Sequence, residues 1–524
     1  MPEKNKQYEI IIDSFGNSGE GIGHIDGYTL FVRGALPGER VRVVVTKVKK
    51  SYGYAKLLEV AEPSPDRREP ACPVYSRCGG CELQHMSYEA QLRFKTEHVK
   101  DCLTRIGGVP GLLLPDELQC GQTSTAGDSD DVQSAVPEHP VRMETIGCDL
   151  TDKTGKPNPW HYRNKAQFPV GREADGRAVA GFFASRSHRI IPCENCLLQD
   201  EWINRAVSII MEQIRRHDYG IPGNGSDILY DETTHTGWLR HIYIRRAVAT
   251  GQLMVCPVVN DDISLFKGLI TGSSDKNAVG LRKKEERSNI EKRRIITDIF
   301  RELKREFDGL FFVLNENRDR TNVITGENYL SLSVEPYIED RIGDITFRIA
   351  PESFYQVNPY ITEKLYRKAL EYAGITGDEI VWDLYCGIGT ISLFMAKKAR
   401  QVIGVEVIPQ AIEDAKKNVE INQINNVSFI CGEADKIILN STLPRPDVVV
   451  VDPPRRGCDE MLLRAIAEAA PSRLVYVSCD PATLARDIAR LRPSGYDVQK
   501  VCVADQFWQT RHVETVVLLT GETL

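Results

Sequence analysis

Residues 380–390 read Ile-Val-Trp-Asp-Leu-Tyr-Cys-Gly-Ile-Gly-Thr, a run of apolar residues that ends in a glycine turn. The apolar run predicts a buried strand over Ile380–Tyr385. Gly387 and Gly389 permit a tight turn that brings the backbone close to a ligand, and the amides of a following helix can then point at it. A strand, a glycine turn and a helix in this order predict the first unit of an open α/β sheet.

Strands and helices alternate around this turn from Glu352 to the C-terminus. Further strands are expected at Gln401–Glu406, Val427–Ile430, Asp447–Val451, Leu474–Ser478 and Val513–Leu519. Helices are expected between them, for example at Pro409–Asn422 and Pro481–Leu491. The alternation predicts a parallel, doubly wound sheet of the Rossmann-like kind over residues 351–524. Ligands of such sheets bind beyond the carboxyl ends of the strands, so residues that follow strands are candidate site residues.

Two acidic residues stand at such positions. Glu406 ends the second strand, where a carboxylate can accept hydrogen bonds from ribose hydroxyls. The glycine turn is not Gly-x-Gly-x-x-Gly, which argues against a dinucleotide and favours a ligand with ribose and adenine but no phosphate, such as S-adenosylmethionine. Asp452 follows the fourth strand in Asp-Pro-Pro-Arg-Arg, where two prolines hold its side chain and the nearby carbonyls in fixed positions. A merely rigid turn is the alternative.

A candidate nucleophile and a candidate base follow two other strands. Cys479 precedes Pro481, which can start a helix, and a helix N-terminus would lower the pKa of the thiol. Glu514 opens the last strand, where burial can raise its pKa toward that of a useful base. Methylation at carbon 5 of a pyrimidine needs both groups. A thiolate adds to carbon 6, carbon 5 then attacks a sulfonium methyl group, and a base removes the carbon 5 proton.

The N-terminal part of the chain is rich in short β-like runs. Four of them, separated by glycine and proline turns, predict a small OB-like barrel over residues 1–62. These runs are Tyr8–Ile12, Thr29–Val32, Val41–Val48 and Ala55–Val60.

Residues 63–350 form a mixed central region that includes an expected helix at Tyr88–Arg105 and a charged helical run at Arg282–Lys304. The segment 110–140 is rich in Gly, Ser, Asp and Pro, and we interpret it as an exposed or disordered insertion. Basic strand-like pieces supply candidate phosphate contacts. These are Arg163, Lys165, Arg245 and Arg246.

A group of cysteines lies in a glycine-rich loop of this central region. Cys72, Cys78 and Cys81 can face one centre, and a fourth thiolate would come from Cys196 or Cys193. Zinc commonly uses paired Cys-x2–4-Cys spacings, whereas iron–sulfur clusters take four thiolates at more varied spacing. The spacing alone leaves both groups open.

The composition is that of a soluble globular protein. Of 524 residues, 42% are hydrophobic and 27% are charged, and the net charge of −7 excludes a uniformly basic nucleic-acid coat but not local basic patches. The first ten residues contain no apolar signal region, and no apolar run is long enough to span a membrane. We therefore expect a cytoplasmic protein whose 14 cysteines are reduced. No membrane partner and no obligate protein partner are expected.

Taken together, these motifs resemble those of bacterial RNA (uracil-5-)-methyltransferases, in particular the 23S ribosomal RNA branch with an N-terminal TRAM domain and a 4Fe-4S cluster. The resemblance is carried by Gly34–Glu39 in the barrel, Ser353–Asn358, Ser478–Asp487 and His512–Glu514. Asp505–Arg511 departs from the family because it lacks the usual Pro-His before the base. The implied roles are Cys479 as nucleophile and Glu514 as proton acceptor, with S-adenosylmethionine contacts at Gln356, Tyr385, Glu406 and Asp452 and cluster ligands at Cys72, Cys78, Cys81 and Cys196.

The resemblance implies methylation of carbon 5 of a uridine in structured RNA, with 23S ribosomal RNA as the expected substrate and transfer RNA uridine 54 as the alternative. Two alternative functions predict other features. Amino methylation of adenine or guanine would need an aromatic residue where Arg455 stands, and it would leave Cys479 without a use. A non-catalytic RNA-binding or ribosome-assembly protein would bind RNA without transferring a methyl group.

Overall fold

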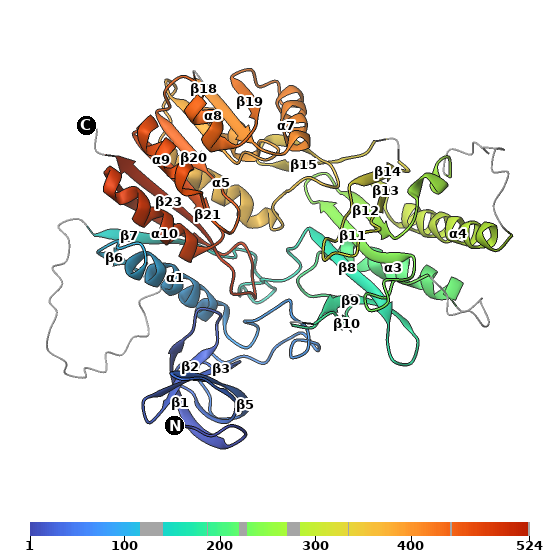
Figure 1. Cartoon of the computed structure of the whole chain (residues 1–524), viewed down its shortest axis with the longest axis horizontal. Helices are drawn as coiled ribbons and strands as arrows, with labels where there is room; N and C mark the ends of the chain where they lie inside the picture. The colour runs from blue at the N-terminus through green and yellow to red at the C-terminus, as the bar shows by residue number, and fades with distance from the viewer. Residues whose placement is uncertain are drawn as a thin grey trace.

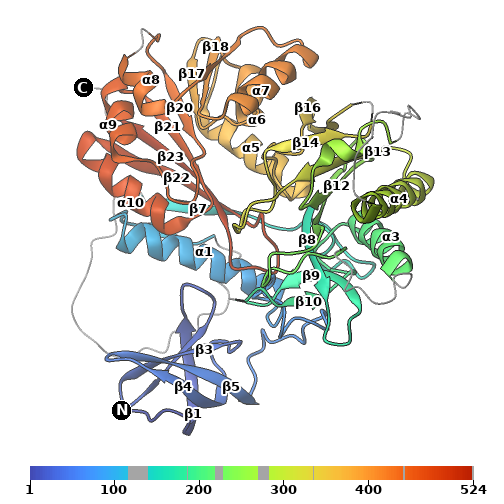
Figure 2. The same cartoon turned by 45° about the vertical axis from the view of Figure 1, so that its right-hand side comes forward.

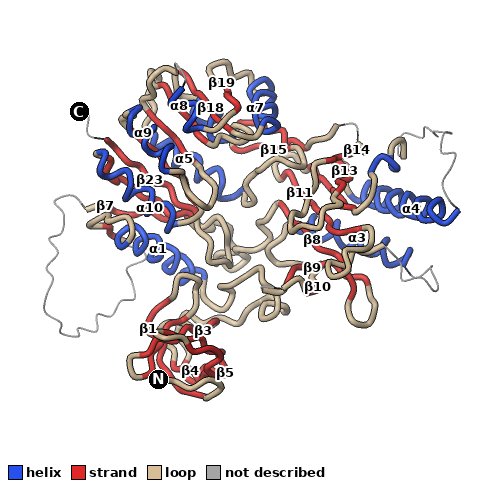
Figure 3. Tube along the Cα trace, viewed as in Figure 1, coloured by secondary structure: helices blue, strands red, loops and turns tan. Residues whose placement is uncertain are grey.

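The computed structural model describes residues 1–115, 140–185, 187–218, 228–269, 283–333, 335–440 and 443–521. Figure 1 shows three parts: a small barrel in blue, a central sheet in green and a large sheet with helices in orange and red. Loops fill the middle of the molecule, where the three parts meet (Figure 3). Apart from residues 110–115 and 140, the predicted insertion lies outside the described residues.

The N-terminal strands form a closed barrel, as predicted, and their order around it is β1-β2-β3-β5-β4. Alternate residues point inward because side chains of a strand alternate between its two faces, and Leu30, Val41 and Val43 have no exposed surface. The strands are β1 (Gln7–Phe15), β2 (Gly21–Ile25), β3 (Tyr28–Arg33), β4 (Arg40–Val48) and β5 (Tyr52–Glu62).

Helix α1 (Tyr88–Arg105) has the predicted bounds, and it begins where the Ser87 side chain accepts a hydrogen bond from the Ala90 amide at 3.2 Å. In Figure 2 the helix lies beside α10 (Pro481–Leu491), which it contacts. Helix α1 therefore links the cysteine-rich loop before it to the large sheet.

The central sheet has seven strands in the order β10-β9-β8-β11-β12-β13-β14. Its strands are β8 (Lys165–Arg172), β9 (Ala178–Phe183), β10 (Ile190–Pro192), β11 (Leu239–Ala247), β12 (Gln252–Val259), β13 (Leu310–Glu316) and β14 (Asn328–Ser331). Helices α3 (Glu201–Asp218) and α4 (Lys283–Glu306) contact each other beside it, and η1 (Ile263–Phe266) is a short 3-10 helix. Although α4 is highly charged, it buries Ile295, Ile299 and Leu303 in the core.

The large sheet has nine strands in the order β19-β18-β17-β20-β21-β23-β22-β7-β6. Its strands are β6 (Leu112–Leu113), β7 (Val141–Ile146), β17 (Ile380–Leu384), β18 (Gln401–Glu406), β19 (Val427–Cys431), β20 (Val448–Val451), β21 (Arg473–Ser478), β22 (Tyr496–Ala504) and β23 (Glu514–Gly521). Its further helices are α5 (Pro359–Ala373), α6 (Thr390–Ala396), α7 (Pro409–Ile421), α8 (Ala434–Asn440), α9 (Glu460–Ala469) and η2 (Arg492–Ser494). A separate hairpin of β15 (Ile338–Ile342) and β16 (Ile345–Ile349) precedes α5.

The prediction of a wholly parallel sheet is wrong at one side. Strand β23 runs antiparallel to both β21 and β22, because the loop that joins β22 to β23 is too short to make the crossover that parallel neighbours need. Strands β6 and β7 come from before residue 150, and β7 pairs in parallel with β22. The bounds 1–62, 63–350 and 351–524 remain a prediction for the domains. No described helix has both the length and the apolar character that crossing a membrane requires.

Candidate active site

The glycine turn after β17 is held in place by the neighbouring strand. The amides of Tyr385 and Cys386 donate to the Val405 carbonyl at 2.9 and 3.1 Å. Tyr385 has a φ of +68° and Gly389 a φ of +82°, and a Cβ at residue 389 would come within 2.9 Å of the Phe429 ring. The turn therefore requires glycine before α6, and it places Tyr385 at the carboxyl edge of the sheet.

Glu406 lies beside this turn, at the end of β18. One carboxylate oxygen accepts from the Gly387 amide at 3.1 Å, and the other accepts from the amides of Val407 and Ile408 at 2.8 and 3.0 Å. Val407 and Ile408 are 55% and 56% exposed although both are apolar. Val407 and Ile408 therefore form an apolar surface beside the carboxylate, and such a surface suits a planar nucleobase. The sequence analysis missed them, although two apolar residues directly after a strand-ending acid are a usable signal.

Gln356 is buried and belongs to a network of amide groups. Its side-chain oxygen accepts from Gln506 Nε2 at 3.2 Å, and its backbone carbonyl accepts from Asn164 Nδ2 at 3.1 Å. Gln506 also donates to Thr362 Oγ1 at 3.0 Å, while its own Oε1 has no hydrogen-bond partner among the described residues. Gln506 is a site residue that the sequence analysis did not predict, because nothing in its neighbourhood in sequence marks it.

Cys479 follows β21, but the helix after it does not lower the pKa of its thiol. The Asp480 carboxylate caps α10 and accepts from the amides of Ala482 and Thr483 at 3.0 and 3.1 Å, so the helix amides already have an anionic partner. Burial and the charges of Glu514 and Asp452 raise the pKa of Cys479 to about 12. The predicted lowering is therefore wrong, and the free protein holds a protonated thiol at neutral pH.

Two carboxyl groups lie near this thiol. Glu514, the first residue of β23, is 4% exposed, and burial together with the charge of Asp452 raises its pKa well above the usual range. Burial raises the pKa of Asp452 to about 7. Arg455 opposes these effects, since its charge lowers the pKa of both Cys479 and Glu514. The predicted nucleophile and base thus lie close enough to Asp452 and Arg455 for the charges of these two residues to shift their pKa values.

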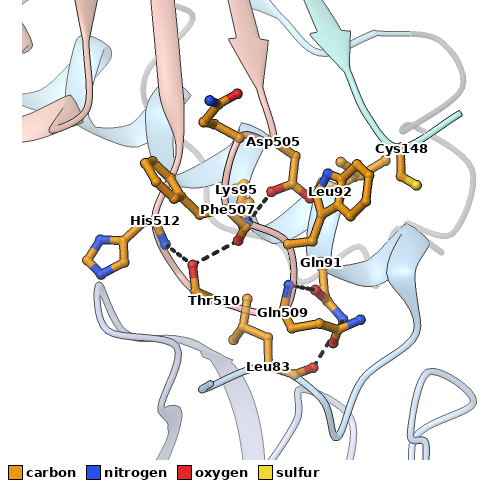
Figure 4. A network of polar contacts seen from close by, with 12 residues as sticks. Leu83, Gln91, Leu92, Lys95, Cys148, Asp505, Phe507, Gln509, Thr510 and His512 are labelled. Atoms are coloured by element: carbon orange, nitrogen blue, oxygen red, sulfur yellow. Dashed lines mark hydrogen bonds and ion pairs between the residues drawn. The ribbon is translucent and has the colours of Figure 1, made fainter. Parts of the chain in front are cut away.

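The loop between β22 and β23, which leads into Glu514, is tied to the segment around α1 (Figure 4). Lys95 and Asp505 form an ion pair of 2.5 Å in which each side chain is 1% exposed. Lys95 also donates to the Phe507 carbonyl at 3.0 Å. Breaking a buried pair by removing one partner leaves an uncompensated charge, so this contact fixes the position of the loop.

Gln509 makes a second set of contacts in the same loop (Figure 4). Its side-chain oxygen accepts from Gln91 Nε2 at 3.0 Å, and its backbone amide donates to Gln91 Oε1 at 3.2 Å. Its carbonyl accepts from the amides of Glu82 and Leu83, both at 3.1 Å. The chain just after Cys81 is thereby joined to the chain just before Glu514.

Five cysteines from two segments line one cavity of about 360 Å³. They are Cys72, Cys78, Cys81, Cys193 and Cys196. Arg163 and Lys165 line it too, and no described Asp or Glu does. Burial raises the pKa of Cys72 and of Cys78, whereas a hydrogen bond from Cys193 lowers the pKa of Cys196. Over the described ranges, no three His, Cys, Asp or Glu side chains gather closely enough to hold a single metal ion.

The predicted phosphate contacts divide into two pairs. Arg163 and Lys165 face the cysteine cavity. Arg245 is 1% exposed and donates both terminal nitrogens to the Ser353 carbonyl at 3.0 Å, and Arg246 pairs with Asp200 at 2.5 Å. The prediction is wrong for Arg245 and Arg246, because their guanidinium groups are engaged inside the protein.

Comparison with known proteins adds to this geometry. Residues 317–522 match the family described as tRNA (Uracil-5-)-methyltransferase, and residues 3–58 match the TRAM domain. A crystal structure of Pyrococcus abyssi tRNA (uracil-54, C5)-methyltransferase in complex with S-adenosyl-L-homocysteine is similar over 98% of this chain and 99% of that chain, with a TM-score of 0.66 and 24% identity. At this identity the likeness shows a shared fold.

Curated relatives are similar along nearly their whole length. A protein of Clostridium tetani described as an uncharacterized RNA methyltransferase is 42% identical over 99% of this chain and 97% of its own. One of Clostridium acetobutylicum with the same description is 43% identical over the same shares, and one of Halalkalibacterium halodurans is 43% identical over 98% and 97%. The chain therefore belongs to the RNA (uracil-5-)-methyltransferase family, with a TRAM domain at its N-terminus.

Proposed function

We propose that this protein transfers a methyl group from S-adenosylmethionine to carbon 5 of a uridine in 23S ribosomal RNA. One observation carries the proposal. Cys479, Glu514 and Asp452 come from three different strand ends, yet they lie close enough together for their charges to act on one another. A nucleophilic thiol beside a carboxylate of raised pKa is what covalent catalysis on a uracil ring requires.

The chain's own residues would act in a fixed order. The Cys479 thiol releases its proton to water, and the thiolate adds to carbon 6, which forms a carbon–sulfur bond and shifts an electron pair toward carbon 5 and oxygen 4. The Arg455 cation favours both the thiolate and this enolate. S-adenosylmethionine, when bound, supplies the methyl group that carbon 5 receives. Glu514 then takes the carbon 5 proton, and the electron pair left behind restores the ring double bond and expels the thiolate.

The surface around Glu406 fits an adenosyl group. The carboxylate offers acceptors to ribose hydroxyls, and the exposed Val407 and Ile408 offer an apolar surface to adenine. Further contacts of the cofactor are assigned, from the resemblance, to Gln356, Tyr385 and Asp452. Gln506 lies next to Gln356 and its buried side-chain oxygen has no partner within the described part of the chain, so it joins this set.

The cysteine cavity fits a 4Fe-4S cluster. Five thiols and two basic residues line it, and no carboxylate of the described residues does, which suits a group that is anionic when four thiolates bind it. Burial and the charges of Arg245 and Arg163 lower the pKa of Lys165 to about 7, and the buried Arg163 Nε has no partner among the described residues. The proposed ligands are Cys72, Cys78, Cys81 and Cys196. The role proposed for the cluster is structural, because the methylation scheme moves no net electrons.

The choice of substrate is the finer part of the proposal. The barrel and the cysteine set support ribosomal RNA through the resemblance, while the description of the matched family names transfer RNA. The test uses purified protein, methyl-labelled S-adenosylmethionine and unmodified transcripts of both RNAs, followed by mapping of the labelled base. We expect 5-methyluridine in 23S ribosomal RNA. Label in transfer RNA alone would make transfer RNA the substrate. Label on an exocyclic nitrogen would mean that the protein methylates an amino group and not carbon 5. RNA binding without label would make the protein a non-catalytic binder.

A further inference from the structure

Helix α5 carries a buried tyrosine that the methylation scheme leaves without a task. The helix contacts α6 and two strands of the large sheet, β21, which ends just before Cys479, and β23, which begins at Glu514. Tyr366 of this helix is 2% exposed. Its ring packs edge-on against Phe394 of α6, with the ring centroids 5.5 Å apart. A buried tyrosine hydroxyl needs polar partners, so the contacts of this group are informative.

The Tyr366 hydroxyl lies between the glycine turn and the network of amide groups. It donates a hydrogen bond to Thr390 Oγ1 at 3.3 Å, and Thr390 directly follows the turn as the first residue of α6. Burial and the charges of Asp452 and Glu514 raise the pKa of Tyr366. A hydrogen bond from Gln356 lowers this pKa by less, so the hydroxyl stays protonated and neutral.

The Gln356 amide is held at both ends by groups that α5 fixes. Its oxygen accepts from Gln506 Nε2 at 3.2 Å, and Gln506 also donates to Thr362 Oγ1 at 3.0 Å. Thr362 and Tyr366 are both buried and lie on the same face of α5, because side chains at positions i and i+4 of a helix do so. An amide has an acceptor at one end and a donor at the other, so only one orientation satisfies both contacts.

The shape of the methyl donor indicates which part of it meets this network. Its sulfonium carries three arms, which are the methyl group, the adenosyl group and an amino-acid chain. The proposed function places the adenosyl group at Glu406 and the methyl group near Cys479. The charge of Glu514 acts on Tyr366, so the tyrosine belongs to the reaction end of the site. The amino-acid arm is the part of the donor that is left for the amide network.

We propose that Tyr366 is a positioning residue, which holds the Gln356 side chain in the orientation that binds the amino-acid arm of S-adenosylmethionine. This arm offers an ammonium and a carboxylate, and each end of the Gln356 amide has one further hydrogen-bonding site for them. Tyr366 acts through Gln356 and does not itself contact the donor. The inference rests on the proposed function in one respect, namely that Gln356 contacts S-adenosylmethionine.

The test compares Tyr366→Phe with Tyr372→Phe in the full chain. Both changes remove a buried hydroxyl from α5, but the Tyr372 hydroxyl donates to Glu144 Oε1 at 2.8 Å and not to a residue of the candidate site. Calorimetry without RNA measures the binding of S-adenosylhomocysteine and of 5′-methylthioadenosine, which lacks the amino-acid arm. We expect Tyr366→Phe to raise the Kd of S-adenosylhomocysteine about ten-fold and that of 5′-methylthioadenosine less than about two-fold. Tyr372→Phe should change neither.

Steady-state kinetics give a result that a loss of packing would not reproduce. For Tyr366→Phe, the KM for S-adenosylmethionine should rise with the Kd, while kcat at saturating donor changes less than about three-fold. Thr390→Val removes the acceptor that orients the hydroxyl and leaves the ring of Tyr366 in place. It should weaken the binding of S-adenosylhomocysteine as well, and the double variant should bind no more weakly than Tyr366→Phe alone, because one hydrogen bond joins the two residues.

Two outcomes would overturn the proposal. One is a Tyr366→Phe protein that melts like wild type and binds S-adenosylhomocysteine as tightly as wild type. The other is an equal loss of affinity for 5′-methylthioadenosine, because the hydroxyl would then not act on the amino-acid arm. A wild-type protein that binds S-adenosylhomocysteine but methylates no uridine would contradict the proposed function alone, since the binding comparison needs neither RNA nor turnover.

Discussion

The pocket at the edge of the large sheet and the cavity in the central region both depend on cysteine, in opposite electrostatic surroundings. Cys479 faces the carboxyl groups of Glu514 and Asp452, which together with burial raise the pKa of its thiol to about 12. The cavity thiols face Arg163 and Lys165 and no described carboxylate. The first setting keeps its thiol neutral until a substrate enters. In the second, burial raises the pKa of Cys72 and Cys78 and a hydrogen bond from Cys193 lowers the pKa of Cys196, so the cations suit an anionic bound group rather than free thiolates. Charged neighbours, rather than cysteine spacing, separate the two uses.

Replacing Cys479 by alanine should have the largest effect of the substitutions considered. It should impair the Cys479 site and leave the cysteine cavity unchanged. We expect methyl transfer to fall by at least about 10³-fold, because the covalent step then lacks its nucleophile, while RNA binding and bound iron remain. Labelled methyl transfer and covalent adduct formation with 5-fluorouridine RNA measure the change. Cys502→Ala, in the same sheet and fully buried, is the control. Normal methylation by the Cys479 variant would remove the nucleophile assignment.

Replacing Glu514 by glutamine should block the last step rather than the first. Turnover is expected to fall by about 10²- to 10⁴-fold, the usual contribution of a general base. Because the thiolate can still add, the protein should accumulate as a covalent complex with unmodified RNA on a denaturing gel. Glu460→Gln, an exposed carboxylate on α9, serves as the control. Absence of the complex, together with full turnover, would assign the base elsewhere.

Replacing Cys81 by serine tests the other side of the comparison. Protein purified without oxygen should lose its iron and acid-labile sulfide, with a smaller loss of methylation than either pocket variant. Cys148→Ser is the matched control, because Cys148 is partly buried, as Cys81 is, but does not line the cavity. Cys193→Ser should keep iron and Cys196→Ser should lose it. Wild-type protein that carries no iron after such a preparation would contradict the cluster.

A pH dependence gives a further test of the Cys479 side of this comparison. The thiolate is the reactive form, so alkylation of Cys479 by iodoacetamide should become about ten-fold faster with each pH unit from 7 to 10. Mass spectrometry of the labelled peptide follows the rate, and Cys479→Ala protein gives the background. A rate that is already constant at pH 7 would mean that the pKa of this thiol is low, as the sequence first predicted.

Much of the large sheet could be predicted because each element carries its own signal. β18 and α10 have the predicted bounds, since a run of apolar residues and an N-terminal proline mark them locally. The antiparallel β23 and the addition of β7 could not be predicted, because strand pairing depends on distant segments. The place of Gln506 in the candidate site could not be predicted for the same reason.

The candidate site, too, could be predicted from the sequence only in part. The motifs identified Cys479 and Glu514 as site residues, and their assigned roles stay predictions. The pKa of Cys479 could not be derived from its position, because Asp480 competes for the helix amides. Asp505–Arg511, which departs from the family pattern, provides the contacts that join α1 to the pocket.

The contacts in Figure 4 have a consequence for synthesis on the ribosome. Lys95 and Gln91 meet their partners Asp505 and Gln509 across separations of 410 and 418 residues. The barrel closes with contacts among the first 62 residues. The ion pair of Lys95, in contrast, can form only after Asp505, near the end of the nascent chain, has emerged. A polypeptide cut short by premature termination would carry a finished barrel and no working methylation centre.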